Sequence, residues 1–335
     1  STLVVAIPKK WADEVELKHG SHVNIERETD GSFRIITKEA EKRQRPKFSL
    51  NADKCGAPGM LVRALTGIYL TGVDTIRVYS KKELQPSHLE QTRYAVQHLT
   101  GLGIIEQVSN EVVIQDFIDP VKFSFESLIK HILQILSFMQ ETIIKALEER
   151  GSSLAAEVSN LEDEVDRVYW LAVRQLLLAV RDTSIGSKIG IPSLSHVVGN
   201  HVIVKCLEEI ADHYENIGLT VGDALKKGLE PDHKYLKAVA KYNEQLYRTT
   251  RGILDIILSG NIYKANLLIN DIEDLLSDID ASTSKLLEVG DRIPFAININ
   301  SILWNLRAIA RQSRSILETV INQSLGECED LTYSA

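Results

Sequence analysis

The sequence predicts an α+β protein that is mostly α-helical, with a β-rich N-terminal unit, a small α/β connector and two tandem three-helix bundles. Three observations indicate this class. Short β-branched runs separated by turn residues end before residue 50, helix and strand patterns alternate over residues 58–118, and helical apolar periodicity fills almost all of the chain from residue 123 onward. Long helices with apolar seams pack into bundles.

Composition limits the class of protein. The 335 residues suffice for two or three domains. No apolar run reaches about 18 residues, the length that a membrane span needs, and there is no signal-peptide pattern. The three cysteines are far apart, so we expect reduced thiols and a cytoplasmic protein. The net charge of −8 argues against non-specific nucleic-acid binding by the whole molecule, although residues 1–50 carry ten Lys/Arg against eight Asp/Glu.

The N-terminal unit reads as a helix and a hairpin. Pro8 suits the first helical position, residues 22–27 and 32–37 form strand patterns, and Thr29-Asp30-Gly31 is a turn between them. A unit of fewer than fifty residues cannot bury a core alone, so we expect a second copy to complete it.

Two segments of this unit, Ser1–Trp11 and Leu17–Val23, resemble the AbrB/SpoVT swapped-hairpin family. The resemblance implies that two chains interleave their hairpins into one dimeric DNA-binding barrel. It also implies DNA contacts from basic residues near the hairpin ends, here Lys9, Lys10, Arg27 and Arg34. The alternative is a module that only dimerises, and the eight acidic residues favour it because phosphate contacts need uncompensated cations.

The connector follows a charged segment, Glu39–Lys47, that is typical of a linker. The residue pattern of the connector predicts a helix at residues 59–71, a strand at 74–79, a second helix at 86–100 and a hairpin at 104–115. It contains no phosphate-binding loop and no cluster of His and Cys ligands. We expect His88 and His98 to be surface or capping residues.

Carboxylates follow the edge of the apolar stripe on two of the predicted long helices. Glu208, Asp212 and Glu215 do so on the helix that contains Ile203–Ile217, and Glu162 and Asp166 do so on the helix over residues 153–181. If the stripes pack together, these acids face each other and raise each other's pKa unless a cation lies between them. The alternative is an ordinary solvated helix edge.

The pattern recurs in three later helices, at residues 235–258, 261–287 and 298–325. Ile302–Ile316 aligns with Ile203–Ile217 without a gap, and the matches fall mainly on the packing stripe, as a duplicated bundle requires.

The acids are not repeated. Arginines take their places on one helix (Arg307, Arg311 and Arg314), and on its partner Glu273 and Asp274 remain while Ser277 replaces Asp166. We expect Arg307 and Arg311 to form ion pairs with Glu273 and Asp274, which leaves one metal-capable site per chain, in the first bundle. The alternative is that the arginines bind an anion such as phosphate.

The two-bundle pattern, with the motifs Leu207–His213 and Leu161–Asp166, resembles the PhoU phosphate-uptake regulator family over roughly residues 121–325. Joined to the N-terminal unit, it looks like the archaeal PhoU proteins that carry an AbrB-type domain. The resemblance implies iron or other metals bound by Glu/Asp-x-x-x-Asp motifs, and action with a phosphate ABC transporter and, in bacteria, a sensor kinase. The ligands it implies are Glu162, Asp163, Asp166, Glu208 and Asp212, with Glu209 and Glu215 marginal and His213 structural.

The interpretation is a cytoplasmic, non-enzymatic regulator of phosphate uptake that binds DNA and dimerises through residues 1–47. Residues 48–120 are the connector, and 121–228 and 229–335 the two bundles. Hard oxygen ligands favour iron, manganese or magnesium. Two alternatives remain: a metal-free adaptor that docks to a phosphate transporter or another protein, and a metal-dependent helical-bundle enzyme. The absence of Glu-x-x-His pairs on the carboxylate lines counts against the enzyme.

Overall fold

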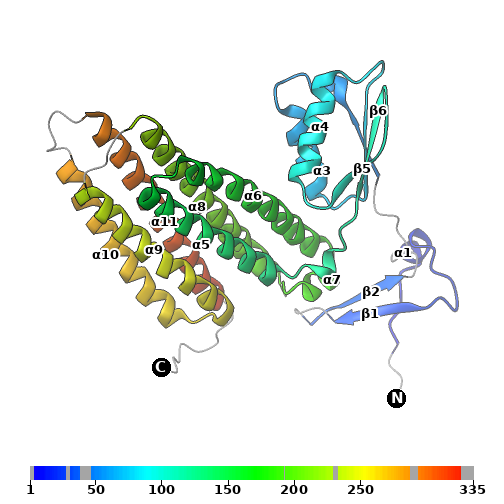
Figure 1. Ribbon diagram of the computed structural model, residues 1–335. Coiled ribbons are helices and arrows are strands. Elements are labelled where there is room, and N and C mark those ends of the chain that lie inside the picture. Colours follow the sequence, from blue (N-terminus) through cyan, green and yellow to red (C-terminus); the bar gives the residue numbers. More distant parts are fainter. Residues whose placement is uncertain are drawn as a thin grey trace.

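The computed structural model describes residues 4–27, 31–37, 47–191, 193–228, 233–286 and 293–325. In Figure 1, a small N-terminal hairpin unit and an α/β domain lie at one end of a long helical body. The predicted class, mostly α with an N-terminal β unit, is confirmed. None of the described helices is long and apolar enough to cross a membrane.

The N-terminal unit consists of helix α1 (Lys9–Glu14) and the antiparallel strands β1 (Val23–Arg27) and β2 (Phe33–Thr37). Ile25 and Phe33 on these strands are 63% and 69% exposed. Two strands bury too little apolar surface to be stable alone, so this surface needs a cover. Thr29 and Asp30 of the predicted turn, and residues 39–46 of the predicted linker, lie outside the described residues.

The α/β domain is a four-stranded sheet with two helices packed against it (Figure 1). Its strand order is β3-β4-β6-β5, with β3 parallel to β4 and the other pairs antiparallel. In chain order the elements are β3 (Lys47–Asn51), the 3₁₀ turn η1 (Ala52–Lys54), α3 (Met60–Leu70), β4 (Thr75–Tyr79), α4 (Pro86–His98), β5 (Leu102–Val108) and β6 (Glu111–Asp116).

The α/β domain tests the expectations for Lys47 and His88. Assigning Lys47 to the linker was wrong, because it begins β3, a strand whose hydrogen bonds come from β4, more than twenty residues away in the sequence. The capping role for His88 is confirmed: the main-chain N–H of Gln85 donates to His88 Nδ1 at 3.4 Å at the start of α4.

Within the described residues, the body contains six long helices. After the 3₁₀ turn η2 (Pro120–Lys122) come α5 (Phe125–Glu149), α6 (Ser152–Arg181), the short α7 (Thr183–Lys188), α8 (Leu194–Lys226), α9 (His233–Ser259), α10 (Ile262–Leu286) and α11 (Ile293–Leu325). The predicted break after α6 is partly filled by α7, whose first turn is capped by Asp182, its carboxylate accepting from the main-chain N–H of Ser184 at 2.9 Å.

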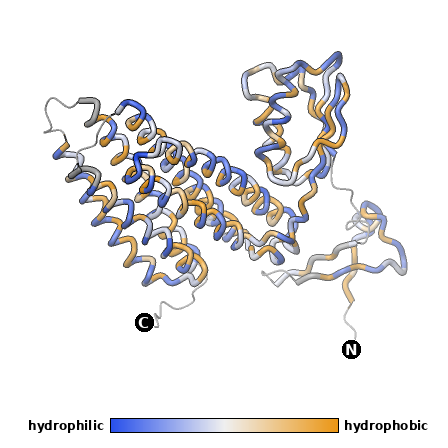
Figure 2. Tube along the Cα trace, in the orientation of Figure 1, coloured by the Kyte–Doolittle hydropathy of each residue, from blue (hydrophilic) through white to orange (hydrophobic). Residues whose placement is uncertain are grey.

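The buried stripes of the long helices form one continuous hydrophobic core. Both members of the repeat pairs Ile203/Ile302 and Leu207/Leu306 are buried in it. Helix α8 packs on α11 and α5 packs on α9, so the two halves of the body are joined along two helix pairs. In Figure 2 hydrophilic and hydrophobic residues alternate along these helices, as expected of helices that bury one face.

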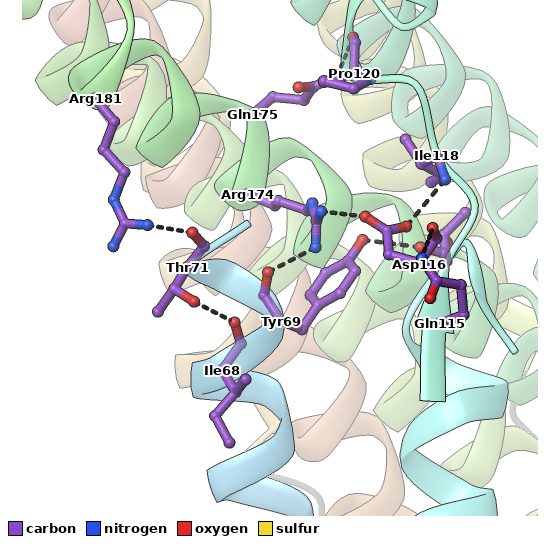
Figure 3. Close-up of polar contacts among 11 residues, drawn as sticks. Ile68, Tyr69, Thr71, Gln115, Asp116, Ile118, Pro120, Arg174, Gln175 and Arg181 are labelled. Atoms are coloured by element: carbon purple, nitrogen blue, oxygen red, sulfur yellow. Dashed lines mark hydrogen bonds and ion pairs between the residues drawn. The ribbon is translucent and has the colours of Figure 1, made fainter. Parts of the chain in front are cut away.

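The α/β domain is attached to α6 by buried polar contacts (Figure 3). Arg174 donates to an oxygen of Asp116 and, at 2.7 Å, to the main-chain carbonyl of Tyr69, with its guanidinium 4.5 Å from the Tyr69 ring centroid. Further along α6, Arg181 donates to the carbonyl of Thr71. Helix α6 therefore belongs to the body's core on one side and anchors the α/β domain on another.

Candidate metal centre

Three carboxylates from two helices converge on one point of the body. Each of Glu162 and Asp166 on α6 and Asp212 on α8 offers an oxygen, and these three oxygens lie within 4.8 Å of one another. Glu162 and Asp166 share a helix face because they are four residues apart, and the packing of α6 on α8 brings Asp212 to that face.

A close approach of the two helices supports this arrangement. A Cβ added at Gly218 of α8 would lie 3.0 Å from the carbonyl oxygen of Ala155 and from Cβ of Val158 on α6. Only glycine fits here without displacing the neighbouring helix. The close packing lies within two turns of Asp212 and holds its carboxylate against those of α6.

Burial and mutual repulsion of the carboxylates outweigh the effect of the neighbouring positive groups on this cluster. Burial, followed by the charges of Asp166, Glu215, Asp212 and Asp163, raises the pKa of Glu162 to about 8. Burial and the neighbouring Asp212 and Asp163 raise the pKa of Asp166 as well, against the lowering effect of Lys205 and His98. A proton or a cation is therefore needed to neutralise the cluster near neutral pH.

Asp163 and Glu208, also predicted as ligands, lie outside the converging trio. Asp163 Oδ1 lies 3.7 Å from Nε2 of His98, on helix α4 of the α/β domain. Glu208 is buried and forms an ion pair with Lys205, and burial raises the pKa of Glu208 although Lys205 acts to lower it. Both side chains have protein partners that a shared metal would have to replace.

Sequence reasoning missed the approach of His98 to the acids. His98 stacks on Tyr94 with 3.9 Å between ring centroids, and its Nδ1 lies 2.8 Å from the Tyr94 carbonyl oxygen, which leaves Nε2 facing Asp163. No local pattern could have revealed this contact, because it depends on how the α/β domain docks on α6.

Glu209 and Glu215, the two marginal candidate ligands, and the neighbouring His213 have different contacts. Glu209 accepts a hydrogen bond from the side chain of Gln312 on α11, whereas Glu215 is near enough to Glu162 to raise its pKa. Nδ1 of His213 lies 2.9 Å from Oδ1 of Asn305, and its ring meets Trp304 edge-on at 5.5 Å. His213 thus joins α8 to α11, the structural role expected of it.

The expected ion pairs of the second bundle form with different partners. Arg307 pairs with Asp280 at 2.8 Å, and Arg314 approaches Glu273 at 3.9 Å. The predicted pairing of Arg307 and Arg311 with Glu273 and Asp274 was wrong. Among the described residues, neither Arg311 nor Asp274 forms an ion pair.

The reason for this correction is the register of two antiparallel helices. Arg314 follows Arg307 by seven residues on α11, while Glu273 precedes Asp280 by seven on α10. Arg307 and Glu273 are therefore separated by about 10 Å along the helix axes. The alignment of the two bundles does not contain this axial register, so it could not predict which residues pair.

The predicted DNA-contact residues are described only in part. Lys9 and Lys10 are exposed at the start of α1. Arg27 lies opposite Phe33 in the hairpin register and Arg34 lies opposite Glu26, but the side chains of both arginines are outside the described part of the structure.

The PhoU domain model matches residues 129–221, and the model for the antidote-toxin recognition protein MazE, a bacterial antitoxin, matches residues 1–44. The search of curated proteins found no match. The PhoU match begins in α5, ends in α8 and contains all three converging carboxylates.

Two solved structures share the fold. The phosphate transport system regulatory protein PhoU from Streptococcus pneumoniae superposes with a TM-score of 0.52 at 17% identity, covering 62% of this chain and 96% of that one. PhoU from Pseudomonas aeruginosa gives a TM-score of 0.53 at 17% identity, covering 60% and 96%. The chain is therefore similar to the PhoU domain over residues 129–221 and to the MazE model over residues 1–44, and its helical body has the fold of the two PhoU structures.

Proposed function

We propose that this protein is a regulator of phosphate uptake whose helical body binds a metal ion between α6 and α8. The observation that carries the proposal is the convergence of Glu162, Asp166 and Asp212 inside the PhoU-matched region. PhoU proteins are regulators rather than enzymes, and the S. pneumoniae relative is described as a phosphate transport system regulatory protein. We assign no catalytic residue.

The proposed ligand set has a centre and a periphery. Glu162, Asp166 and Asp212 form the centre, and Asp163 and Glu208 join it only if they leave His98 and Lys205. A cation removes the mutual repulsion that raises the carboxyl pKa values. Oxygen ligands without cysteine suit iron, manganese or magnesium.

We propose that the N-terminal domain joins two chains and binds DNA. The exposed Ile25 and Phe33 supply apolar surface that a second copy would cover, and the exposed Lys9 and Lys10 supply cations for phosphate. In this arrangement residues 1–47 form the dimer module, 48–120 the connector, and 121–228 and 229–335 the two halves of a cytoplasmic body that acts on a phosphate transporter subunit.

Metal content tests the central proposal. The protein purified without chelator, and the variant Asp166→Ala/Asp212→Ala, would be compared by elemental analysis after loading with iron, manganese or magnesium and removal of free metal. We expect stoichiometric metal in the parent and a loss in the variant. The exposed Asp223 on α8 provides the control, since Asp223→Ala should retain the metal. A parent that stays metal-free after loading would contradict the assignment and favour the adaptor that docks through its acids.

DNA binding is tested separately. Fluorescence anisotropy with random and promoter-derived duplexes would measure affinity at several salt concentrations. Lys9→Ala/Lys10→Ala should weaken binding and reduce the slope of log affinity against log salt by about two for each chain whose two lysines contact phosphates. If the parent and the variant have equal DNA affinity and equal salt slope, Lys9 and Lys10 do not contact DNA, and dimerisation remains as the proposed role of the N-terminal domain.

A further inference from the structure

Five exposed aliphatic side chains lie on the ends of α6 and α8 that meet at α7 (Figure 1). Leu194, Val198 and Val202 recur every four residues on one face of α8, where they are 61%, 70% and 40% exposed. Leu177 and Val180 on α6 are 39% and 47% exposed. Contiguous exposed apolar surface marks a contact site, and we call these five residues the aliphatic patch.

The axial register of α6 on α8 places the two sets of side chains at the same level. The close approach at Gly218 and the position of the Lys205 ammonium, 5.6 Å from the ring centroid of Tyr169, show that the two helices are antiparallel. Val180 lies eleven residues after Tyr169, and Leu194 lies eleven residues before Lys205. Both are therefore displaced from this contact by about 16 Å in the same direction.

The aliphatic patch lies on the same side of the two helices as the acid cluster. Val180 follows Glu162 by 18 residues, and Leu194 precedes Asp212 by 18 residues. Since 18 residues make five complete turns of an α-helix, each aliphatic side chain points to the same side as its acid. Glu162 and Asp212 converge across the α6–α8 pair, so Val180 and Leu194 approach each other further along it.

The segment that contains the patch is almost free of acidic residues. The chain has 46 Asp and Glu among 335 residues, but residues 167–207 contain only Asp182. The Asp182 carboxylate is used at the start of α7, where it accepts from the main-chain N–H of Ser184 at 2.9 Å. The exposed Arg181 and Lys188 belong to this segment, and neither forms an ion pair with another described residue. In a chain of net charge −8, the patch thus has positive charge at its edge.

Composition favours a lipid surface over a protein as the cover of the patch. Protein interfaces concentrate binding energy in Trp, Tyr and Arg, with Leu and Val under-represented, whereas every member of the patch is Leu or Val. A two-fold contact between two copies of the patch would bring the cations at its edge close to their own copies. Aliphatic side chains beside Lys and Arg are typical of surfaces that bind anionic lipids.

We propose that the aliphatic patch docks the body on an anionic membrane surface. The five side chains enter the boundary between headgroups and acyl chains, and Arg181 and Lys188 contact the headgroup phosphates. Along the helix axes the acid cluster lies about 27 Å from Val180 and Leu194, so its negative charges stay clear of the lipid.

Sedimentation of the full chain with vesicles tests this proposal. Vesicles of phosphatidylcholine, with or without phosphatidylglycerol, are compared in chelator at several salt concentrations. We expect saturable binding to the vesicles that contain phosphatidylglycerol, weakening as salt rises. Leu194→Gln/Val198→Gln should bind about tenfold more weakly, because two aliphatic side chains no longer leave water. Lys188→Glu should also weaken binding about tenfold, and only to the anionic vesicles.

Tyr263 and Leu267 on α10 provide the matched control. They too are four residues apart on a helix and exposed, at 61% and 46%, but their helix is rich in acids. Tyr263→Gln/Leu267→Gln should bind vesicles as the parent does. All of these substitutions are at exposed positions, so the thermal unfolding of each variant should match that of the parent.

Three results would overturn the proposal. The first is a parent that does not bind the anionic vesicles at low salt. The second is equal binding by the parent and Leu194→Gln/Val198→Gln; if Lys9→Ala/Lys10→Ala abolishes binding instead, the lipid contact lies in the N-terminal domain. The third is a patch variant that changes the oligomeric state in light scattering, which would show that a second chain covers the patch.

The outcome is independent of the proposed metal centre. Because the vesicle experiment is performed in chelator, Asp166→Ala/Asp212→Ala should bind vesicles as the parent does. Failure of the metal assignment therefore leaves the lipid contact standing, and failure of the lipid contact leaves the metal assignment standing.

Discussion

Arg174 of helix α6 and Asp116 at the end of strand β6 form an ion pair whose side chains are only 2% and 0% exposed (Figure 3). The pair joins the α/β domain to the helix that also carries Glu162 and Asp166. Because α6 packs against α8 as well, displacement of the α/β domain relative to the body would disturb the acid cluster. The candidate metal centre and the α/β domain are thus both attached to helix α6.

Breaking this ion pair should be costly. Arg174→Met leaves Asp116 charged and buried, and we expect the free energy of unfolding to fall by about 3–5 kcal/mol. Denaturant unfolding monitored by circular dichroism measures it. In Arg174→Met/Asp116→Asn the charge is gone, while an oxygen remains to accept from the main-chain N–H of Ile118, so the double variant should be more stable than the single one. Equal losses in both would show that unpaired charge is not the cause.

The metal-free protein should lose stability as the pH rises. The pKa of Glu162 is about 8 when folded, against 4.5 for an ordinary glutamate, so between these values the folded state binds more protons than the unfolded state. The contribution of protonated Glu162 to the free energy of unfolding is fully present below pH 4.5 and is lost progressively as the pH rises through 8. Unfolding measured in chelator over this range should show the slope, and Glu162→Gln should reduce it.

The control for this pH dependence is the exposed Asp271 on α10. Asp271→Asn should keep the parent's slope. Addition of a bound metal should stabilise the parent most at high pH, because the deprotonated carboxylates are then available as ligands. A slope that is unchanged in Glu162→Gln would contradict the assignment of a raised pKa to this residue.

The second bundle should accept a transplanted site. In the second bundle Glu273 aligns with Glu162. Arg314, which aligns with Glu215, lies 3.9 Å from Glu273, and Glu215 is likewise a neighbour of Glu162. Ser277→Asp/Arg311→Asp/Arg314→Glu restores the acids of the first bundle, and we expect a second equivalent of metal per chain by elemental analysis. Arg311→Asp/Arg314→Glu without the change at Ser277 is the control and should bind less. Equal metal in parent and triple variant would mean that the two helix pairs differ in geometry.

Dimerisation through the N-terminal domain should depend on its exposed apolar residues. Phe33→Glu places a charge on a strand that we propose a second chain covers, and it should shift the protein from dimer to monomer in light scattering after size exclusion. Ile105 on β5 is 55% exposed, so Ile105→Glu is a matched change on another surface and should leave the dimer intact. A dimer that survives Phe33→Glu but not Ile105→Glu would move the interface to the α/β domain.

Periodicity alone located the long helices and the face that each one buries. Ile203, Leu207 and Ile210 recur at helical spacing and all lie in the core, because burial of an apolar stripe follows directly from the 3.6-residue turn. Periodicity also placed Glu162, Asp166 and Asp212 on helix faces that were expected to approach each other, and these three carboxylates converge in the structure.

Contacts that depend on axial register or on domain docking were decided by tertiary structure. The pairing of Arg307 with Asp280, the approach of His98 to Asp163 and the buried Arg174–Asp116 pair each join elements whose relative position no local pattern encodes. A helix can slide by about 1.5 Å per residue against its neighbour while keeping the same buried face, and the sum of many side-chain contacts selects one register. The sequence thus determined which faces meet, and packing determined which residues on those faces touch.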